Sequence, residues 1–398
     1  MARPGKDIEL AAVEDGDSAF GKYRLVRKIA DGGMATIYLA TSVGPGGFEK
    51  PCAVKRIRSE YSATPSFRDM LVREAKVAAL LNHPNIVQVF DFGQVEDEYY
   101  LTMEWVEGAA LSQILKRAAR KRIPIGLGPV LQVTSALARA VEYLASGLTV
   151  DGVRTQLVHR DISPSNVLVS NTGVIKLTDF GIVKVLDAPQ GTAAGVIKGK
   201  YAYMSPEQLR GEPLDSRSDV FSLGVVMYEA LTKKRLFRRD DVASTIAAVL
   251  GGSVPRPSTI AGDIPAEVDE LVLAMLSKRA AERPSASEVR ARVDALASEH
   301  GARGTDRLAT LARGDNEADN DDPSFAQAST ALLGDVPLIP TASDAPAVMP
   351  DLASAYPSQT SIHMHGAPAS PNTAAWWALA IVLLAITSTL AFWAFVLS

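Results

Sequence analysis

The stretch HRDISPSN, residues 159–166, decides what fold and chemistry are expected of this chain. Thirteen residues after Asn166, and directly after the strand-like VIKLT, comes DFG at 179–181. The Asn166 amide and the Asp179 carboxylate offer the hard oxygen ligands that a magnesium nucleotide requires, and Asp161 can accept the proton of a substrate hydroxyl. DFG alone is nearly noise in a chain of this length, but HRD-x-x-x-x-N followed closely by DFG is specific. The combination indicates a site for phosphoryl transfer.

Lys55 and Glu74 extend this expected site towards the N-terminus. Lys55 lies in the strand-like CAVKRI on one face with Ala53 and Ile57, where it requires either an anion or a solvated edge. The following segment SFRDMLVREAKVAALL predicts a helix, and Glu74 falls inside its apolar stripe. Because an unpaired buried carboxylate is costly, we expect Glu74 to pair with Lys55; alternatively, Glu74 lies at a loosely packed end and reaches water. The apolar stripe consists of Phe67, Met70, Leu71, Val77, Ala78 and Leu81.

The segment KIADGGMATIYLA, residues 28–40, predicts two strands joined by a glycine-containing turn. Glycine allows a backbone to approach phosphate groups closely. This signal is weak when taken alone, because Gly32-Gly33 suits any hairpin.

Composition narrows the possible classes of protein. The chain has 398 residues and a net charge of −4, which gives no indication of a nucleic-acid partner. The single cysteine, Cys52, excludes an intramolecular disulfide and a cysteine-rich zinc site. The start, MARPGKDIELAAVEDGD, has no apolar core, so no signal peptide is predicted.

The sequence pattern predicts an α+β fold with two lobes. Short segments rich in β-formers, such as YRLVRKI and TIYLA, come first, and helical patterns such as GPVLQVTSALARAVEYLA dominate later. We expect a small β-rich lobe with one main helix, followed by a larger helical lobe. The expected segments are a polar lead (1–20), a folded domain (21–298, with lobes 21–105 and 106–298), a disordered Ala/Pro/Ser/Asp-rich linker (299–373) and a membrane segment (374–398).

The membrane segment is predicted from Trp376–Leu397, which contains 22 residues without a charge. A helix of this length spans roughly 33 Å, close to the ~30 Å hydrocarbon core of a bilayer. Trp376 and Trp377 at one end and Trp393 near the other suit the two interfaces. A buried core helix is the alternative. Because only Ser398 follows, we expect a C-terminal tail anchor.

Taken in order, these motifs match the protein-kinase signature set, and residues 23–296 resemble the eukaryotic-like (Hanks-type) serine/threonine protein kinases of bacteria. The resemblance implies the bilobal protein-kinase fold, ATP with Mg²⁺ or Mn²⁺, and protein substrates with Ser or Thr acceptors. By resemblance Asp161 is the catalytic base, Lys55 holds the α- and β-phosphates and pairs with Glu74, and Asn166 and Asp179 hold the metal.

The resemblance also implies an ATP site and a set of structural residues. Met103 is similar to the gatekeeper, and Glu104, Trp105 and Val106 to the hinge beside adenine. Glu207 is expected to pair with Arg283, and Asp219 to brace the catalytic loop. The implied ATP-binding residues are Ile29, Ala30, Asp31, Gly32, Gly33, Met34, Ala35, Ile37, Ala53, Lys55, Met103, Glu104 and Val106. The implied structural residues are His159, Phe180, Gly181, Glu207, Asp219 and Arg283.

Three features, which involve four residues, depart from the family pattern. Ala30 and Ala35 replace the outer glycines of G-x-G-x-x-G-x-V, which costs little if φ stays negative and more if the turn requires positive φ. Ser163 replaces the lysine of the catalytic loop, and Lys200 in GKYAYMSPE replaces a threonine. Since the resemblance makes these two positions neighbours, we expect Lys200 to supply the missing charge and Ser163 to take over the hydrogen bonding. Alternatively, Lys200 points to solvent and the site is crippled.

Regulation and partners also follow from the resemblance. Arg160 is expected to bind a phosphorylated Thr192, the only threonine between DFG and the SPE motif. Use of ATP implies the cytoplasmic face of the cell (inner) membrane, with a single pass. Ala378, Ala385 and Ala391 can support helix pairing in a homodimer or simply face lipid. A membrane-anchored pseudokinase scaffold and a small-molecule phosphotransferase are the alternative functions.

Overall fold

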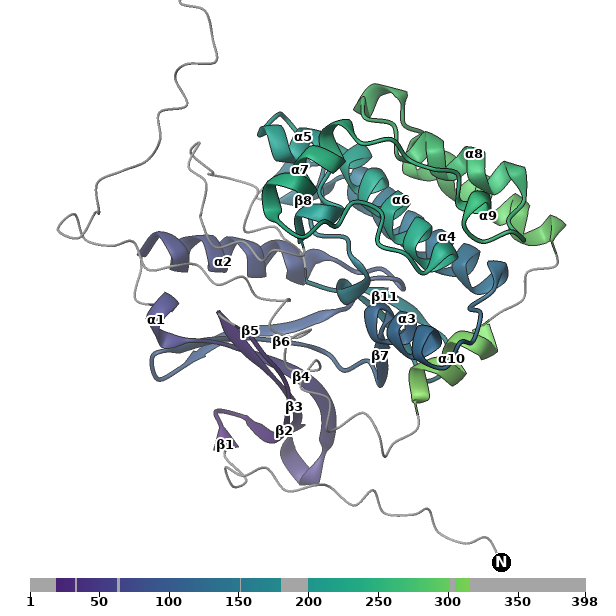
Figure 1. The fold of residues 1–398 in the computed structure, drawn as a ribbon. Coiled ribbons are helices and arrows are strands. Elements are labelled where there is room, and N and C mark those ends of the chain that lie inside the picture. Colours follow the sequence, from purple (N-terminus) through teal and green to yellow (C-terminus); the bar gives the residue numbers. More distant parts are fainter. Residues whose placement is uncertain are drawn as a thin grey trace, which may run out of the picture. The chain divides into compact units, whose positions relative to one another are not determined.

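The structure is a computed structural model that describes residues 19–32, 34–62, 65–150, 152–179, 200–300 and 305–314. These residues all lie within one unit of the chain, residues 1–338. They form the predicted arrangement of a β-rich lobe followed by a helical lobe, as Figure 1 shows.

The first lobe is an antiparallel six-stranded sheet in the order β1-β2-β3-β4-β6-β5. Its long strands β2, β3 and β4 form a meander. Lys55 on β4 lies opposite Ile37 on β3 and Leu101 on β6. The helix α2 lies beside this sheet on the side of the helical lobe (Figure 1). The bounds are β1 Ala19–Phe20, β2 Tyr23–Asp31, β3 Ala35–Val43, β4 Glu49–Ile57, α1 Ser59–Ser62, α2 Pro65–Leu80, β5 Val89–Val95 and β6 Glu98–Glu104.

The second lobe is built around two buried helices, α4 and α6. Both carry apolar side chains on nearly all faces, so they are enclosed by the other helices of the lobe. Stacked rings of Phe221 and Phe237, 5.8 Å apart, lie in the same core. The helices are α3 Leu111–Arg120, α4 Leu127–Ala145, α5 Pro206–Arg210, α6 Ser216–Thr232, α7 Val242–Gly251, α8 Ala266–Met275, α9 Ala286–Glu299 and α10 Thr305–Arg313.

A small three-stranded sheet, β11-β10-β7, carries the loops of the expected site. Its strands are β7 Gly108–Ala110, β10 Val167–Ser170 and β11 Ile175–Leu177, and a separate hairpin is formed by β8 Leu148–Val150 and β9 Val153–Thr155. At Gly108 a Cβ atom would lie 2.0 Å from the Val169 carbonyl oxygen, so only glycine allows β7 to approach β10 this closely. The sheet therefore begins directly after the expected hinge and ends directly before Asp179.

Two of the predicted segment boundaries are wrong. Ala19 and Phe20 belong to the sheet and not to the polar lead, because the Phe20 ring packs edge-on against Tyr100 at 5.5 Å. Residues 305–313 form the helix α10 inside the segment predicted to be a disordered linker, and Leu308 on this helix is fully buried.

The predicted membrane segment is not tested by this fold. Among the residues that the structure describes, no helix has the length and apolarity needed to span a bilayer. Residues 376–397 lie outside the described residues.

Candidate active site

The expected ATP-binding residues surround a cavity of about 360 Å³. Its lining includes residues of β2, β3, β4, β6 and β7 from the sheets, residues of α3 and α10, and Asp179. Of the predicted residues, Asp31, Gly32, Met34, Ala35 and Lys55 do not line this cavity. The predicted residues that line it are Ile29, Ala30, Ile37, Ala53, Met103, Glu104 and Val106.

The turn between β2 and β3 accepts alanine without strain. Ala30 and Ala35 are buried, at 5% and 0% exposed, and neither is among the described residues with positive φ. The turn is closed by the Gly32 backbone N–H, which donates to the Ala35 carbonyl at 3.0 Å. The two alanines therefore have backbone angles that any residue can adopt. The turn does not require positive φ at these two positions, so the cost expected in that case does not arise.

A polar cluster holds this turn to the end of β4. Asp31 Oδ1 accepts hydrogen bonds from Thr36 Oγ1 at 2.9 Å and from Arg58 Nη2 at 2.8 Å, and Arg58 Nε donates to the Gly32 carbonyl at 3.1 Å. Burial alone would raise the pKa of Asp31, but the hydrogen bonds from Thr36 and Lys28 outweigh it and lower the pKa. Sequence reasoning missed Arg58, which carries no motif signal.

Lys55 pairs with Asp179 and not with Glu74. Lys55 Nζ donates to Asp179 Oδ1 at 3.0 Å, and both side chains are largely buried. Burial alone would lower the pKa of Lys55 and raise that of Asp179, but their mutual attraction reverses both shifts. Among the described residues no Lys55–Glu74 ion pair lies within 4.0 Å, so the predicted pair is wrong for this conformation.

Glu74 nevertheless lies near this pair. It lines a small cavity of about 40 Å³ together with Lys55 and Asp179. Burial raises the pKa of Glu74 to about 7, although Lys55 acts in the opposite direction. The helix α2 therefore brings Glu74 to the expected place without completing the contact.

Asn166 has the free oxygen that a metal ligand requires. Its Nδ2 donates to the Asp161 carbonyl at 2.8 Å and to Asp161 Oδ2 at 3.0 Å. Asn166 Oδ1 is buried and has no hydrogen-bond partner among the described residues. With the carboxylate of Asp179 also at the site, these residues fit a hard divalent cation such as Mg²⁺.

Lys200 reaches Asp161 from the other side of the site. It begins the short 3-10 turn Lys200–Tyr203, and its Nζ lies 2.5 Å from Asp161 Oδ2. The side chains of both residues are largely buried, so the alternative in which Lys200 points to solvent is wrong. Ser163 is 4% exposed, but within the described part of the chain its hydroxyl has no hydrogen-bond partner. The predicted hydrogen-bonding part of Ser163 is thus absent here.

The backbone of the catalytic-loop motif is held by Asp219. Its carboxylate accepts the backbone N–H groups of His159 at 2.7 Å and Arg160 at 2.9 Å, as expected of a brace. Burial lowers the pKa of His159 to about 4, so the ring is neutral. Because His159 Nδ1 accepts the Asp161 N–H, its Nε2 carries the proton and donates to the Thr178 carbonyl at 3.2 Å.

Two residues of the motifs have left-handed backbones, Arg160 with φ 67° and Asp179 with φ 57°. Such conformations are costly for residues other than glycine and persist only where the surroundings enforce them. Asp219 enforces the first and the Lys55 ion pair accompanies the second.

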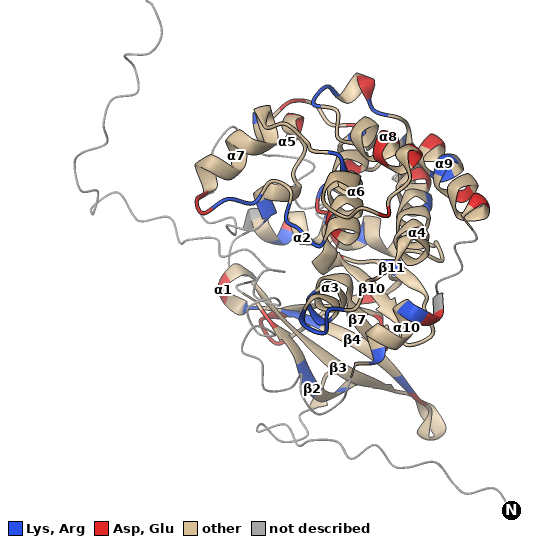
Figure 2. Cartoon of the chain, turned by 45° about the vertical axis from the view of Figure 1, so that its right-hand side comes forward, with Lys and Arg blue, Asp and Glu red and all other residues tan. Residues whose placement is uncertain are grey.

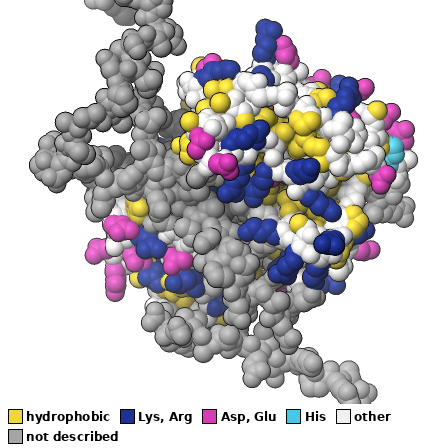
Figure 3. Space-filling model, viewed as in Figure 1, with side chains coloured by type: hydrophobic (Ala, Val, Ile, Leu, Met, Phe, Trp, Pro, Cys, Tyr) yellow, Lys and Arg dark blue, Asp and Glu magenta, His cyan; other side chains and the backbone are white. Residues whose placement is uncertain are grey.

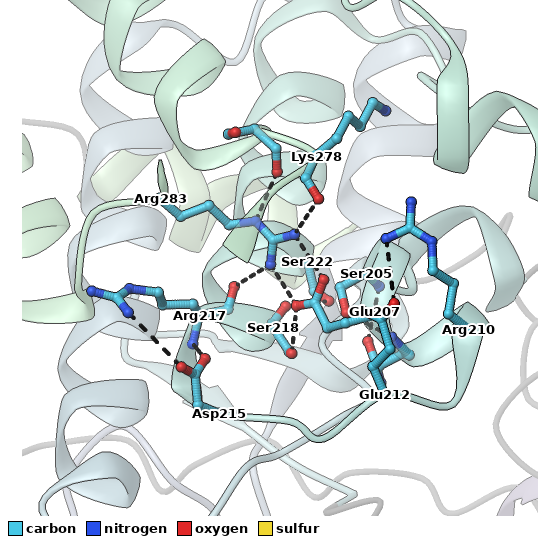
Figure 4. Close-up of polar contacts among 12 residues, drawn as sticks. Ser205, Glu207, Arg210, Glu212, Asp215, Arg217, Ser218, Ser222, Lys278 and Arg283 are labelled. Atoms are coloured by element: carbon cyan, nitrogen blue, oxygen red, sulfur yellow. Dashed lines mark hydrogen bonds and ion pairs between the residues drawn. The ribbon is translucent and has the colours of Figure 1, made fainter. Parts of the chain in front are cut away.

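The predicted Glu207–Arg283 pair is present and bidentate. Arg283 Nη1 and Nη2 donate to the two carboxylate oxygens at 2.6 and 2.8 Å, as Figure 4 shows. Ser218 Oγ also donates to Glu207 at 2.6 Å. Burial alone would raise the pKa of Glu207, but the hydrogen bonds from Arg283 and Ser218 lower it to about 2.

Sequence reasoning missed Gln208, which links this pair to the catalytic-loop motif. Gln208 caps α5 with Ser205 and donates to the Arg160 carbonyl at 3.0 Å. The capping-box spacing Ser205-x-x-Gln208 was the available signal. The predicted residues Gly33, Phe180, Gly181 and Thr192 lie outside the described residues.

Comparison with known protein families matches residues 23–293 to the family described as "Protein kinase domain". The chain belongs to the protein kinase family. Members of this family use ATP and a divalent metal. The kinase domain of this chain has the residues for both, namely Lys55, Asp161, Asn166 and Asp179.

Several curated relatives resemble the kinase domain. Tyrosine-protein kinase MasK of Myxococcus xanthus is 40% identical over 71% of this chain and 44% of its own length. Serine/threonine-protein kinase PknA of Mycobacterium tuberculosis is 39% identical over 66% of this chain and 58% of its own length. Serine/threonine-protein kinase PrkC of Bacillus subtilis is 33% identical over 65% and 38%. The chain thus matches only about half the length of these relatives.

The fold is similar to that of solved kinase domains. The kinase domain of Mycobacterium tuberculosis PknI superposes with a TM-score of 0.52 at 26% identity, covering 70% of this chain and 98% of that one. The bilobal protein-kinase fold is therefore confirmed.

Proposed function

We propose that this protein is an active, ATP-dependent serine/threonine protein kinase in which Lys200 supplies the charge of the absent catalytic-loop lysine. The observation that carries this proposal is the 2.5 Å contact between Lys200 Nζ and Asp161 Oδ2. It supports a cation at the catalytic carboxylate despite Ser163, and a scaffold protein would not need one there.

Each residue then has a definite part in the transfer. Lys55 would bind the α- and β-phosphates. Asn166 Oδ1 and Asp179 would hold the divalent metal, which would neutralise phosphate charge. The acceptor oxygen bonds to the γ-phosphorus as the bond to the β–γ bridging oxygen breaks and ADP leaves. Asp161 accepts the proton of the acceptor hydroxyl, and Lys200 faces the charge spread over the transferred phosphoryl oxygens.

Serine and threonine are the proposed acceptors. PknA and PrkC are named serine/threonine kinases, whereas MasK is named a tyrosine kinase. Protein substrates remain part of this proposal, as does phosphorylation of Thr192 with Arg160 as its partner.

We also propose that residues 376–397 insert into a bilayer and hold the kinase domain at the cytoplasmic face, where ATP is present. The support is the length and apolarity of that segment. In cell fractionation, the full chain should be recovered with membranes after a high-salt wash. A variant with Leu383 and Leu384 changed to Arg should move to the soluble fraction, and unchanged recovery with membranes would contradict the anchor.

The deciding experiment is phosphate incorporation from γ-labelled ATP by the purified full chain in detergent, with Mg²⁺ and then Mn²⁺. Asp161→Asn is the matched inactive variant, because the amide keeps the shape of the side chain but cannot accept the proton. Incorporation that disappears in Asp161→Asn, with phosphoserine or phosphothreonine as product, supports the proposal. Phosphotyrosine alone would contradict the acceptor class.

A membrane-anchored pseudokinase is the second candidate. The observation that favours it is the absence of a Lys55–Glu74 ion pair in the described structure. ATP binding without incorporation under both metals would favour this scaffold over the active kinase.

A further inference from the structure

The helix α10 lies outside the family match, which ends at residue 293, yet it is packed on the kinase domain. Figure 1 shows it beside α3 and β7, the elements that follow the expected hinge. Its apolar face is buried to the degree of a core helix. The buried residues are Leu308 (0% exposed), Ala309 (3%), Leu311 (8%) and Ala312 (3%).

The C-terminal end of α10 is fixed by three hydrogen bonds to the kinase domain. The last carbonyls of a helix have no partner within the helix. Here Arg117 Nη1 on α3 donates to the Leu311 carbonyl at 3.0 Å and to the Ala312 carbonyl at 3.1 Å. Arg313 Nε donates to the Asn171 carbonyl, in the turn after β10, at 3.1 Å. The end of α10 is therefore tied to α3 and to the small sheet.

Ala312 and Arg313 lie in the wall of the 360 Å³ cavity, together with residues of the β-rich lobe. Arg27 and Arg117 line the same cavity, so guanidinium groups from β2, α3 and α10 surround it. Glu104 and Glu107 also line it, and Glu104 is paired with Lys176 at 2.8 Å. The cavity lining thus combines apolar residues with three arginines and three acidic residues.

The helices beside this cavity carry further basic residues. Figure 2 shows Lys and Arg on both α3 and α10, and Figure 3 shows Lys and Arg side chains on the face seen from the direction of Figure 1. Clustered cations raise the local concentration of polyanionic ligands and speed their association. The basic residues of α3, its following turn and the C-terminal end of α10 are Lys116, Arg117, Arg120, Lys121, Arg122 and Arg313.

We propose that α10 forms one wall of the nucleotide pocket and that Ala312 and Arg313 contact the bound nucleoside triphosphate. Ala312 contributes apolar surface and Arg313 contributes a cation whose position is set by Asn171. This inference depends on one part of the proposed function, the binding of a nucleotide in this cavity. It does not require phosphoryl transfer.

The test measures the Kd of the purified full chain for Mg·ATP and for adenosine by calorimetry. Arg313→Ala should weaken ATP binding about three- to tenfold, with a smaller loss for adenosine, and Arg313→Lys should retain most of the affinity. Leu308→Asp, which places a charge in the buried face and releases the helix, should weaken ATP binding at least as much. Arg307→Ala is the matched control, because Arg307 is an exposed arginine on the same helix outside the pocket wall.

Hydrogen exchange gives a second measurement on the unmodified chain. By linkage, a ligand that contacts α10 must also protect it, so peptides covering 305–314 should exchange more slowly with Mg·ATP than without.

The proposal is overturned if Arg313→Ala and Leu308→Asp both leave the ATP Kd within about twofold of the wild-type value. A loss of the same size in Arg307→Ala, or exchange in 305–314 that ATP does not change, would overturn it as well. Binding that depends on α10 in a chain without phosphate incorporation would refute the proposed function and leave this inference standing.

Discussion

Lys200 and Asp161 form their ion pair across two segments that are 39 residues apart in the chain. The contact places one positive charge where phosphoryl transfer needs it, although the catalytic loop itself carries Ser163. Because the Ser163 hydroxyl has no partner in the described structure, the charge of Lys200 is the part of the expected exchange that the geometry supports.

Lys200→Thr should lower kcat by about 10²–10³, the typical effect of removing one electrostatic contact to the transition state. Ser163→Lys alone should also harm activity, because it places a second cation beside the first. The double variant should recover much of the rate, since it restores one lysine and one hydroxyl. Steady-state phosphorylation assays measure the cycle, with the exposed Lys234→Thr as control. Losses that simply add in the double variant would refute the exchange.

The buried ion pair between Glu207 and Arg283 contributes to the stability of the domain. Arg283→Ala should destabilise the domain by about 3–5 kcal/mol, because it leaves a buried carboxylate without its cation. Arg279→Ala is the matched control, since Arg279 is 81% exposed and its pair with Glu282 should be worth less than about 1 kcal/mol. Urea unfolding measures both, and equal losses in the two variants would contradict the assignment.

At the scale of elements, the helix α2 holds Glu74 in a position that responds to pH. A carboxyl whose pKa is raised binds its proton more tightly in the folded state. The contribution of Glu74 to stability is therefore present below pH 4.5 and lost as the pH rises through about 7.

Glu74→Gln should consequently leave stability nearly unchanged at pH 5 and raise it by about 1–3 kcal/mol at pH 8, where the wild-type carboxyl is ionised. Activity should fall at pH 8, because glutamine cannot form the ion pair with Lys55 that the family implies. Denaturant unfolding at the two pH values checks the first part. Asp69→Asn is the control, because it removes the charge of an exposed carboxylate on the same helix. A gain of the same size at both pH values would exclude burial of the charge as its cause.

The missing glycines of the β2–β3 turn suggest that restoring a glycine would help. The structure of the turn leads to the opposite prediction. Ala35 is fully buried without positive φ, so Ala35→Gly should cost about 0.5–1 kcal/mol of stability and leave ATP affinity within about twofold. Calorimetric binding together with thermal unfolding measures the two effects. A clear gain in ATP affinity would show that alanine does restrict the turn.

The strands, the long helices and the two-lobe order could be predicted from the sequence, because apolar residues recur in them at regular spacing over many positions. The motif residues Asp161, Asn166 and Asp179 could be predicted because they are close together in the chain. The partner of Lys55 could not, since Asp179 and Glu74 compete for it and only packing decides. Arg58 and Arg117 escaped notice because their contacts depend on residues distant in sequence.

At the scale of the whole molecule, the folded unit extends beyond the family match. The missed helix had a readable signal, because Leu308, Ala309, Leu311 and Ala312 recur at helical spacing in TDRLATLAR. Composition of the surrounding linker outweighed this short pattern in the prediction of disorder. The kinase domain of this chain therefore includes a helix that joins it to the segment leading towards residues 376–397.

A chain ended after residue 314 should consequently be more stable than one ended after residue 300. Burial of Leu308 and its neighbours on α10 is worth on the order of 2 kcal/mol, and the helix also supplies the Leu311 and Ala312 carbonyls that accept hydrogen bonds from Arg117. Urea unfolding of the two chains, followed by far-UV circular dichroism, measures the difference. Leu308→Asp in the longer chain should reduce its stability to that of the shorter one, whereas the exposed Arg307→Ala should not. Equal midpoints for the two chain lengths would mean that α10 does not belong to the cooperative unit, and its place in the pocket wall would then have to come from nucleotide binding itself.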